Sequence, residues 1–231
     1  MKLSSKAETL KKIKLKNSVI PPLYSFNVLD YKKNKINILN KIREKFEKNV
    51  AVRSSNFAED SSKSSFAGYF KSFLNVKISD KFNLDKKIND VINSYKNHRS
   101  TKNQVFIQEM VQNVTLSGVA ASCDSRTQSP YTIIEFNLGN DTSIVTSGKS
   151  NTSTFKYIDI KTAKTNNKRI LNLIKSIEEI KEIIKNKNIE IEFAIDRKKV
   201  IYILQIRYLI TSNNLYSITK SQLLKSLKKL E

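Results

Sequence analysis

The alternation of apolar and polar residues near the C-terminal end predicts a β-hairpin with strands at 189–195 and 199–206. A turn at Asp196–Lys199 would pair Ala194 with Ile201. Because successive side chains of a strand point to opposite faces, one face of this hairpin is expected to be apolar. That face would carry Ile189, Ile191, Phe193 and Ile195 against Val200, Tyr202, Leu204 and Ile206.

The opposite face of the predicted hairpin is polar. It gathers Glu190, Glu192, Gln205 and, just beyond, Arg207, with Glu190 facing Gln205 and Glu192 facing Ile203. A slip by one residue would set carboxylates against the apolar face, so the pattern favours a single register.

Apolar residues three or four positions apart predict helices over 36–46, 82–97 and 170–184, and a last helix in the tail from 218 to 231. The apolar stripes of the first three, which begin at Ile36, Phe82 and Ile170, are expected to cover a sheet. Segments rich in β-branched and aromatic residues predict strands. Helices and strands do not alternate regularly, which favours an α+β fold with largely antiparallel sheets. Besides the hairpin, strands are expected at 50–53, 69–76, 105–110, 117–123, 131–136 and 154–160.

The polar stretch at 98–103 indicates a boundary between two lobes of similar size. We expect an N-terminal lobe over 1–103 that contains a phosphate-binding loop, and a C-terminal lobe over 104–212 that contains a metal site. Residues 213–231 are expected to form a C-terminal helix or the start of a linker to a further domain.

The charge of the chain changes this picture little. With 42 Lys+Arg against 21 Asp+Glu the net charge is +21, which raises nucleic acid or an anionic membrane surface as a partner. Only seven of the basic residues are arginines, and no basic cluster is interleaved with aromatic residues that could stack on bases. A solvated basic surface, or one that faces an acidic partner, is therefore favoured over nucleic-acid binding.

Other features exclude several classes of protein. The sequence contains neither an apolar run of membrane-spanning length nor a signal peptide, which predicts a soluble, cytoplasmic protein. The single Cys123 is expected to be a buried, reduced thiol, and the single His98 a surface residue. No His and Cys cluster suits zinc, and no Ser-His-Asp arrangement is credible.

The polar face of the hairpin suits a magnesium ion that carries a polyphosphate. Two carboxylates and an amide oxygen are hard ligands of the kind that Mg²⁺ shares with phosphate oxygens. Arg207 could neutralise the same phosphates with its planar guanidinium. A solvated strand face decorated with Glu and Arg accounts for the same residues, and the residues alone do not choose between the two.

The loop after Arg53 suits an anion. Its serines offer hydroxyl and backbone donors, and Gly68 allows a close backbone approach. The loop contains neither a Walker-type phosphate motif nor a dinucleotide-binding glycine motif, and a Ser-rich surface loop is the alternative. The serines are Ser54, Ser55, Ser64 and Ser65.

These residues resemble the N-terminal nucleotide-binding domain of the phosphoenolpyruvate synthase and pyruvate, phosphate dikinase family, which has a two-lobed, ATP-grasp-type fold. The resemblance is carried by nine blocks in the family's order. They are SSKAETL at 4–10, IPPLYSF at 20–26, VAVRSSNFAEDSSKSSFAGYFKSFLNV at 50–76, VFIQEMV at 105–111, LSGVAASCD at 116–124, IIEFNLG at 133–139, TSGKSN at 146–151, IEIEFAID at 189–196 and IYILQIRYLIT at 201–211.

The resemblance implies ATP and Mg²⁺ as cofactors and assigns roles by motif position. Catalytic phosphate contacts are implied for Lys6, Arg53 and Arg207. Magnesium binding is implied for Glu192 and Gln205, and also for Glu190, two residues before Glu192. Further nucleotide contacts are implied for Ser65 and Gly68 in a lid-like loop, and for Gln108, Glu109 and Met110 in the strand that passes the adenine.

The implied function is that of an ATP-dependent, dikinase-type phosphotransferase. In that family the β-phosphoryl group of ATP passes to a histidine on a swivelling domain, AMP and phosphate are released, and the group then reaches a small acceptor such as pyruvate or the amide of glutamine. No phosphohistidine motif is present, so that domain is expected either in cis, in a missing C-terminal part, or in trans.

A capsule-related glutamine kinase is the branch that we favour. Ser4, Ser5 and Leu23 stand where the family usually has glycines. They leave open a catalytically inactive nucleotide-binding or scaffolding module. A basic nucleic-acid-binding protein is the third alternative.

Overall fold

The computed structural model describes residues 1–56, 70–95, 100–139, 153–158, 165–185, 188–211 and 219–228. The contacts of the chain divide it into two compact units. The N-terminal unit consists of Ser4–Lys12 and Pro21–Val111, and the C-terminal unit consists of Met1–Leu3, Ile13–Ile20 and Gln112–Glu231.

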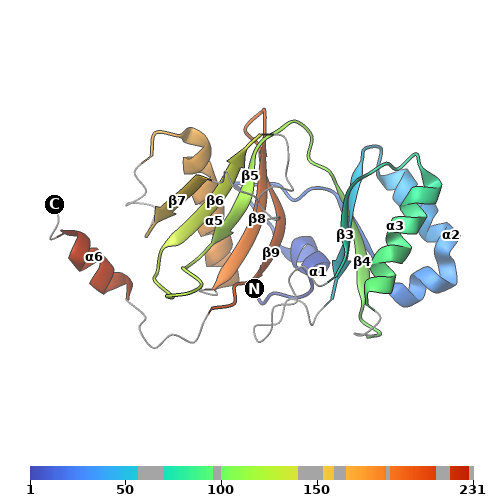
Figure 1. Ribbon diagram of the computed structural model, residues 1–231, viewed down its shortest axis with the longest axis horizontal. Helices are drawn as coiled ribbons and strands as arrows, with labels where there is room; N and C mark the ends of the chain where they lie inside the picture. Colours follow the sequence, from blue (N-terminus) through green and yellow to red (C-terminus); the bar gives the residue numbers. More distant parts are fainter. Residues whose placement is uncertain are drawn as a thin grey trace. The chain divides into compact units, whose positions relative to one another are not determined.

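The N-terminal unit is built on a four-stranded antiparallel sheet with the order β1-β4-β2-β3. Two helices and the apolar face of the sheet enclose its core, which includes Val52 and Ile107 from the strands and Ile42 and Ile88 from the helices. Both helices lie on the same side of the sheet (Figure 1). The elements are α1 (Lys6–Lys12), β1 (Leu23–Asn27), α2 (Val28–Lys45), β2 (Val50–Ser55), β3 (Ser72–Val76), α3 (Lys81–Ser94) and β4 (Gln104–Glu109).

Two of the apolar residues expected in this core lie outside it. Ile36 of α2 is 77% exposed, because the backbone of Asn34 departs from helical geometry and kinks the helix, which changes the face that later residues present. Phe82, in the first turn of α3, is 81% exposed. The buried stripe of α2 runs instead through Tyr31, Ile38, Leu39 and Ile42.

The C-terminal unit is built on a five-stranded antiparallel sheet with the order β7-β6-β5-β8-β9. The long helix α5 packs on this sheet through β8 and β9, with a buried stripe that includes Leu173, Ile177 and Ile180 (Figure 1). The elements are β5 (Val114–Ala121), β6 (Thr132–Leu138), β7 (Ser153–Tyr157), α5 (Lys168–Ile184), β8 (Ile189–Asp196), β9 (Ile201–Tyr208) and α6 (Lys220–Lys228).

The predicted lobe boundary at 103/104 differs from this division. Strand β4 pairs with β1 and with β2, so it belongs to the N-terminal sheet, and the division falls between Val111 and Gln112. Helix α1 and strand β1 are elements that the apolar pattern did not predict. Among the helices that the structure describes, none is both long enough and apolar enough to cross a bilayer.

The hairpin exists, but its predicted register is wrong. Ala194 pairs with Tyr202 rather than with Ile201, and a bulge lies where Glu192 and Phe193 pair with Gln205 and Ile203, so that Leu204 is the extra residue. Ile203 is therefore buried, while Tyr202 and Leu204 are only half-buried. The bulge changes which residues of β9 share the polar face with β8.

Candidate functional site

The register of β8 and β9 brings the four predicted polar residues together in two direct cross-strand pairs. Glu192 pairs with Gln205, and Glu190 pairs with Arg207. The Leu204 bulge makes this possible, because without it Gln205 and Arg207 would share a face with Ile201 and Ile203. Gln205 is only 2% exposed.

Glu190 and Arg207 form an ion pair within this group. The Nε of Arg207 donates to Oε1 of Glu190 at 2.7 Å, and its Nη2 donates to the same oxygen. The side chains of Glu190 and Arg207 are 17% and 27% exposed. Glu190 thus fixes the guanidinium from one side, and Arg207 neutralises one of the two carboxylates of the group.

A pocket of ≈ 350 Å³ lies beside Glu190 on the same face of the sheet. Across the strands Glu190 is followed by Ala121, Ile133 and Lys156, and these four residues line the pocket together. The loop after β5 adds Asp124 and Arg126 to its wall. The pocket therefore combines an apolar floor with charges of both signs.

The loop that carries Asp124 is held by its own side chain. Oδ1 of Asp124 accepts hydrogen bonds from the backbone amides of Arg126 and Thr127, each at 2.9 Å. The amide of Thr127 is the main cause that holds the pKa of the Asp124 carboxyl below its ordinary value. Asp124 is therefore ionised at neutral pH, and the loop is ordered on the side of the pocket.

Cys123 is buried, as the sequence predicted, and forms no disulfide. Its Sγ lies 3.6 Å from Oδ1 of Asn188. Burial, and secondly the charge of Asp124, raise the pKa of the Cys123 thiol. The thiol stays protonated at neutral pH, which argues against a nucleophilic role.

In the N-terminal unit, Arg53 and Gln108 lie together on the face of the sheet that α2 and α3 do not cover. Nη1 of Arg53 donates to Oε1 of Gln108 at 3.4 Å. The guanidinium also lies over the ring of Phe106, 5.8 Å from its centroid. Arg53 is thus held in place by groups of β4, and its positive charge lies on the face opposite to the helical core.

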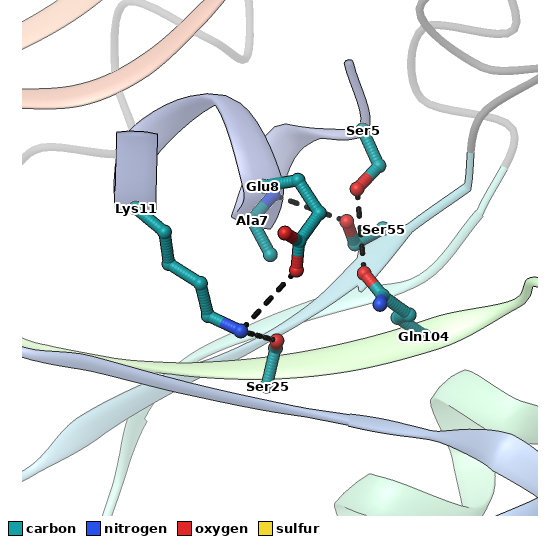
Figure 2. A network of polar contacts seen from close by, with 7 residues as sticks. All are labelled: Ser5, Ala7, Glu8, Lys11, Ser25, Ser55 and Gln104. Atoms are coloured by element: carbon teal, nitrogen blue, oxygen red, sulfur yellow. Dashed lines mark hydrogen bonds and ion pairs between the residues drawn. The ribbon is translucent and has the colours of Figure 1, made fainter. Parts of the chain in front are cut away.

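Helix α1, whose first residue is Lys6, packs against the same face. Figure 2 shows the bonds that hold it there. The backbone amide of Ala7 donates to Oγ of Ser55 at 3.1 Å, and Oγ of Ser5 donates to Oε1 of Gln104 at 3.3 Å. Lys11 donates to Ser25 at 2.5 Å. These bonds fix the start of α1 at the end of β2, so Lys6 lies in the same unit as Arg53.

Glu109 and Met110 are placed by backbone hydrogen bonds at the end of β4. Their amides donate to the carbonyls of Pro22 and Asn49, each at 2.9 Å. The side chain of Glu109 forms an ion pair with Lys48, with Nζ and Oε1 separated by 3.4 Å. The predicted residues Ser65 and Gly68, and also Ser64 and His98, lie outside the described residues.

The site residues fall into two groups, one in each unit. Lys6, Arg53 and Gln108 belong to the N-terminal unit, while Glu192, Gln205 and the Glu190–Arg207 pair belong to the C-terminal unit. Among the described residues, no three His, Cys, Asp or Glu side chains form a cluster that could hold a metal ion. A metal here would need phosphate oxygens or water to complete its shell, which is the manner in which Mg²⁺ usually binds.

Sequence reasoning missed part of the polar face beside this group. Arg126, Lys156 and Glu135 line the pocket, and Ser117 on the same face has a buried Oγ without a hydrogen-bond partner in the part of the chain that the structure describes. Strand β6 pairs Glu135 with Val119, and Val119 pairs with Glu192. Cross-strand pairing therefore links these residues to the predicted site, whereas their spacing in the sequence does not.

Comparison with solved structures shows a related fold. The protein PH1788 from Pyrococcus horikoshii matches with a TM-score of 0.52 and 13% identity, and the match covers 90% of each chain. A D-alanine-D-alanine ligase from Helicobacter pylori matches with a TM-score of 0.49 and 13% identity over 96% of this chain and 57% of the ligase. The VanG D-Ala:D-Ser ligase from Enterococcus faecalis matches with a TM-score of 0.47 and 12% identity, and the match covers 92% of this chain and 57% of the ligase.

This chain thus spans less than two thirds of either ligase, and likenesses of this strength say nothing about substrates. A search of curated proteins found no match. At the level of families, residues 29–162, which are more than half of the chain, match the AMP/ATP-binding domain of pyruvate phosphate dikinase. The two antiparallel sheets with their helices confirm the expected α+β fold with largely antiparallel sheets. The chain belongs to the family of the pyruvate phosphate dikinase AMP/ATP-binding domain.

Proposed function

We propose that this chain binds Mg-ATP and activates it as the nucleotide-binding part of a dikinase-type phosphotransferase. The observation that carries the proposal is the pairing of Glu192 with Gln205 and of Glu190 with Arg207 in a chain of the AMP/ATP-binding family. This pairing offers a carboxylate and an amide oxygen beside a fixed guanidinium. A triphosphate with its metal needs those groups.

The four residues divide the task between them. Glu192 and Gln205 would hold Mg²⁺, and the bound metal would neutralise the charge that develops on the phosphates. Arg207 would contact a phosphate with the part of its guanidinium that faces away from Glu190. Because Glu190 already pairs with Arg207, we assign it the role of orienting that guanidinium rather than of a direct metal ligand.

The N-terminal unit would supply fixed positive charge. Arg53, held between Gln108 and Phe106, and Lys6 at the start of α1 would bind phosphate oxygens of the same nucleotide. Gln108, Glu109 and Met110 would border the adenine. Such preorganised charges stabilise a phosphoryl transfer without reorganisation during the reaction.

The β-phosphoryl group of ATP would then pass to a histidine of a separate swivelling domain, with release of AMP and phosphate, and onward to a small acceptor such as pyruvate or the glutamine amide. The described chain contributes binding and electrostatics to this reaction, and the histidine comes from the partner domain. The small acceptor would be bound by another domain as well.

Substitution of Glu192 tests the proposal. Isothermal titration of the chain with a non-hydrolysable ATP analogue and Mg²⁺ should give one site, and Glu192→Gln should weaken binding by about a hundredfold because a charge-assisted metal contact is lost. Glu182→Gln, at an exposed position of α5 in the same unit, is the matched control and should bind like the unaltered chain. Absence of binding at millimolar nucleotide would reject the proposal.

A nucleotide-binding module without catalysis is the second candidate. It is favoured by the serines at positions 4 and 5, where the family usually has glycines. The two candidates differ in one product. Mixing the chain with ATP, Mg²⁺ and a phosphohistidine domain should release AMP if the chain is catalytic, whereas a binding module would bind the analogue and release none.

A further inference from the structure

A second pocket, of ≈ 330 Å³, lies in the C-terminal unit at the edge of β9. Three separate segments form it: the chain at 16–19, helix α5 and the turn between β8 and β9. Each of them contributes one lysine, namely Lys16, Lys175 and Lys199. The site proposed for the nucleotide uses none of these residues.

The first wall of this pocket is fixed by a carboxylate of α5. Oε1 of Glu179 accepts from the amide of Lys16 at 2.6 Å, and Oε2 accepts from the amide and the side chain of Asn17 at 3.0 and 2.9 Å. Ser176 donates to the carbonyl of Asn17 at 3.0 Å. Val19 then bridges to β9, donating to Ile201 at 2.9 Å.

The opposite wall is fixed by Asp196. Its Oδ1 accepts from the amide of Val200 at 2.9 Å, and its backbone carbonyl accepts from the amide of Lys199 at 3.0 Å. The turn is anchored further by Arg197, whose amide donates to the carbonyl of Asn113 at 2.9 Å. The pocket is therefore built by hydrogen bonds on both sides and does not depend on a ligand for its shape.

The three lysines outnumber the two carboxylates that hold the walls of the pocket, those of Glu179 and Asp196. Among the described residues, none of the ammonium groups of Lys16, Lys175 and Lys199 forms an ion pair with a carboxylate. Burial raises the pKa of the Glu179 carboxyl, but hydrogen bonds from Lys16 and Asn17 and the charge of Lys16 lower it overall, so Glu179 offsets part of the charge of Lys16. Three positive charges thus surround one concave surface.

A buried hydroxyl points to a ligand independently of the charges. Ser18 lines the pocket, is only 8% exposed, and its Oγ is buried without a hydrogen-bond partner in the described part of the chain. A buried polar atom without a partner is costly, and most such atoms in folded proteins are satisfied by protein, water or ligand. Asn172 adds an exposed amide beside it.

From these observations we propose that the pocket binds a small, multivalent, phosphate-bearing anion. Three ammonium groups and a hydroxyl suit several acceptor oxygens on one compact group, and Lys binds phosphate as a point charge without demanding a planar partner. The volume is at the lower end of the range for small-molecule pockets. Val19 and Ile201 offer an apolar wall for the uncharged part of such a ligand.

This pocket is distinct from the Glu190–Arg207 group within the same unit. Ile201 lies at the start of β9 and Arg207 near its end, six positions further along. At about 3.3 Å per residue, the two lie roughly 20 Å apart along the strand. The inference therefore does not depend on the proposed function, and a regulatory role for the ligand is compatible with either candidate.

Titration with pyrophosphate tests the inference. In a ¹⁵N-labelled chain at constant ionic strength, the amide resonances of residues 16–19, 172–175 and 199–201 should shift together and saturate with one binding constant. The combined variant K16Q, K175Q and K199Q should weaken this binding by roughly tenfold or more, since each exposed charge contributes a small amount. Ser18→Ala should weaken it severalfold without loss of thermal stability.

Two controls distinguish binding in this pocket from general attraction of an anion to a basic surface and from binding at the nucleotide site. A variant with K32Q, K33Q and K41Q removes the same charge from exposed positions of α2 and should leave the titration unchanged. Glu192→Gln should also leave it unchanged, whatever its effect on nucleotide. The proposal would be overturned if the two triple variants lost the same amount of pyrophosphate affinity. It would also be overturned by resonance shifts confined to the surroundings of Arg207, or by a titration that does not saturate at millimolar pyrophosphate.

Discussion

The two sheets each bury one face against helices and carry the candidate site residues on the other. In the N-terminal unit, α2 and α3 cover one face, and Arg53 lies on the other with α1 and its Lys6. In the C-terminal unit, α5 packs on the sheet, and the polar group carries Glu190 and Glu192. On the proposed function, Arg53 and Lys6 of one unit would contact phosphate oxygens, and Glu192 and Gln205 of the other would hold the metal, so the two roles can be tested separately.

The two sheets also differ in regularity. Strands β2 and β4 pair without interruption from Val50 to Ser55, whereas β8 and β9 are interrupted by the bulge at Leu204. In the first sheet simple alternation places Arg53 and Gln108 on one face. In the second sheet, the bulge at Leu204 breaks the alternation of β9 and turns Gln205 and Arg207 towards Glu192 and Glu190. The geometry of this polar group therefore depends on how closely the neighbouring strands pack.

The largest expected effect concerns this packing in the C-terminal sheet. Gly118 of β5 pairs with Phe193 on one side and Phe136 on the other, and a Cβ at this position would lie 2.1 Å from the backbone oxygen of Glu135. Gly118→Val should therefore destabilise the protein by about 3 kcal/mol or more, because the clash is with backbone that cannot rotate away. Urea unfolding followed by circular dichroism measures this loss.

Val119→Ala is the matched control for that prediction. Val119 is the next residue of β5 and faces the half-buried polar side, so its truncation should cost only about 1 kcal/mol. A Gly118→Val protein as stable as the Val119→Ala protein would show that the strands around the polar group can separate without cost.

A smaller effect, on the affinity for a nucleotide, distinguishes the proposed phosphate-binding role of Arg53 from the proposed metal-binding role of Glu192. Arg53→Gln should weaken binding of a Mg-ATP analogue by about tenfold, and Glu192→Gln by about a hundredfold. Without magnesium the effect of Glu192→Gln should largely disappear, because its contact acts through the metal, whereas the effect of Arg53→Gln should persist. Titration calorimetry with and without EDTA measures both. If both effects responded equally to magnesium, the division of roles between the two sheets would be wrong.

The smallest expected effect is a pH dependence in the N-terminal unit, where Asp85 joins α3 to α2. The hydroxyl of Tyr31 donates to Oδ1 of Asp85 at 2.7 Å, and Nζ of Lys35 donates to Oδ2 of Asp85 at 2.6 Å. Burial raises the pKa of the Asp85 carboxyl, but hydrogen bonds from Lys35 and Tyr31 outweigh it, and the net pKa is lowered. A lowered pKa means that the ionised form stabilises the fold at neutral pH, and that this contribution is lost as the pH falls through the acid range below about 4.

Asp85→Asn should accordingly lower the free energy of unfolding at pH 7 by about 1 kcal/mol, and the difference from the unaltered chain should shrink towards pH 3. Urea unfolding at the two pH values measures it. Glu44→Gln, at an exposed position of the same α2, should show no such dependence. A difference that grew with acid would contradict the sign of the shift.

Much of the fold could be predicted from local pattern. Helix α5 and most of the strands were expected, because long periodic segments carry a strong signal. Helix α1 was missed because it has only seven residues and is held by tertiary bonds such as that from Ala7 to Ser55. Ile36 was wrongly assigned to the core because a kink at Asn34 cannot be seen in periodicity.

The candidate site shows the same limit. Alternation correctly gathered Glu190, Glu192, Gln205 and Arg207, but their partners were predicted wrongly. The sequence of β9, IYILQIRY, has apolar residues at both odd and even positions, so alternation alone does not choose which set faces inward. Contacts with β8 make that choice, and it requires one bulged residue. The pocket residues Arg126 and Lys156 come from segments far apart in the sequence, which only the sheet brings together.

The short bridge at Val19 has a consequence for how the protein behaves at high concentration. Strand β9 is the outermost strand of its sheet, and an unpaired outer strand is a template on which another chain can add and aggregate. Val19 donates to Ile201 and accepts from Ile203, each at 2.9 Å, and so occupies part of that row of backbone groups. The segment before β1 therefore covers part of this edge strand and hinders a second copy of the chain from pairing with it.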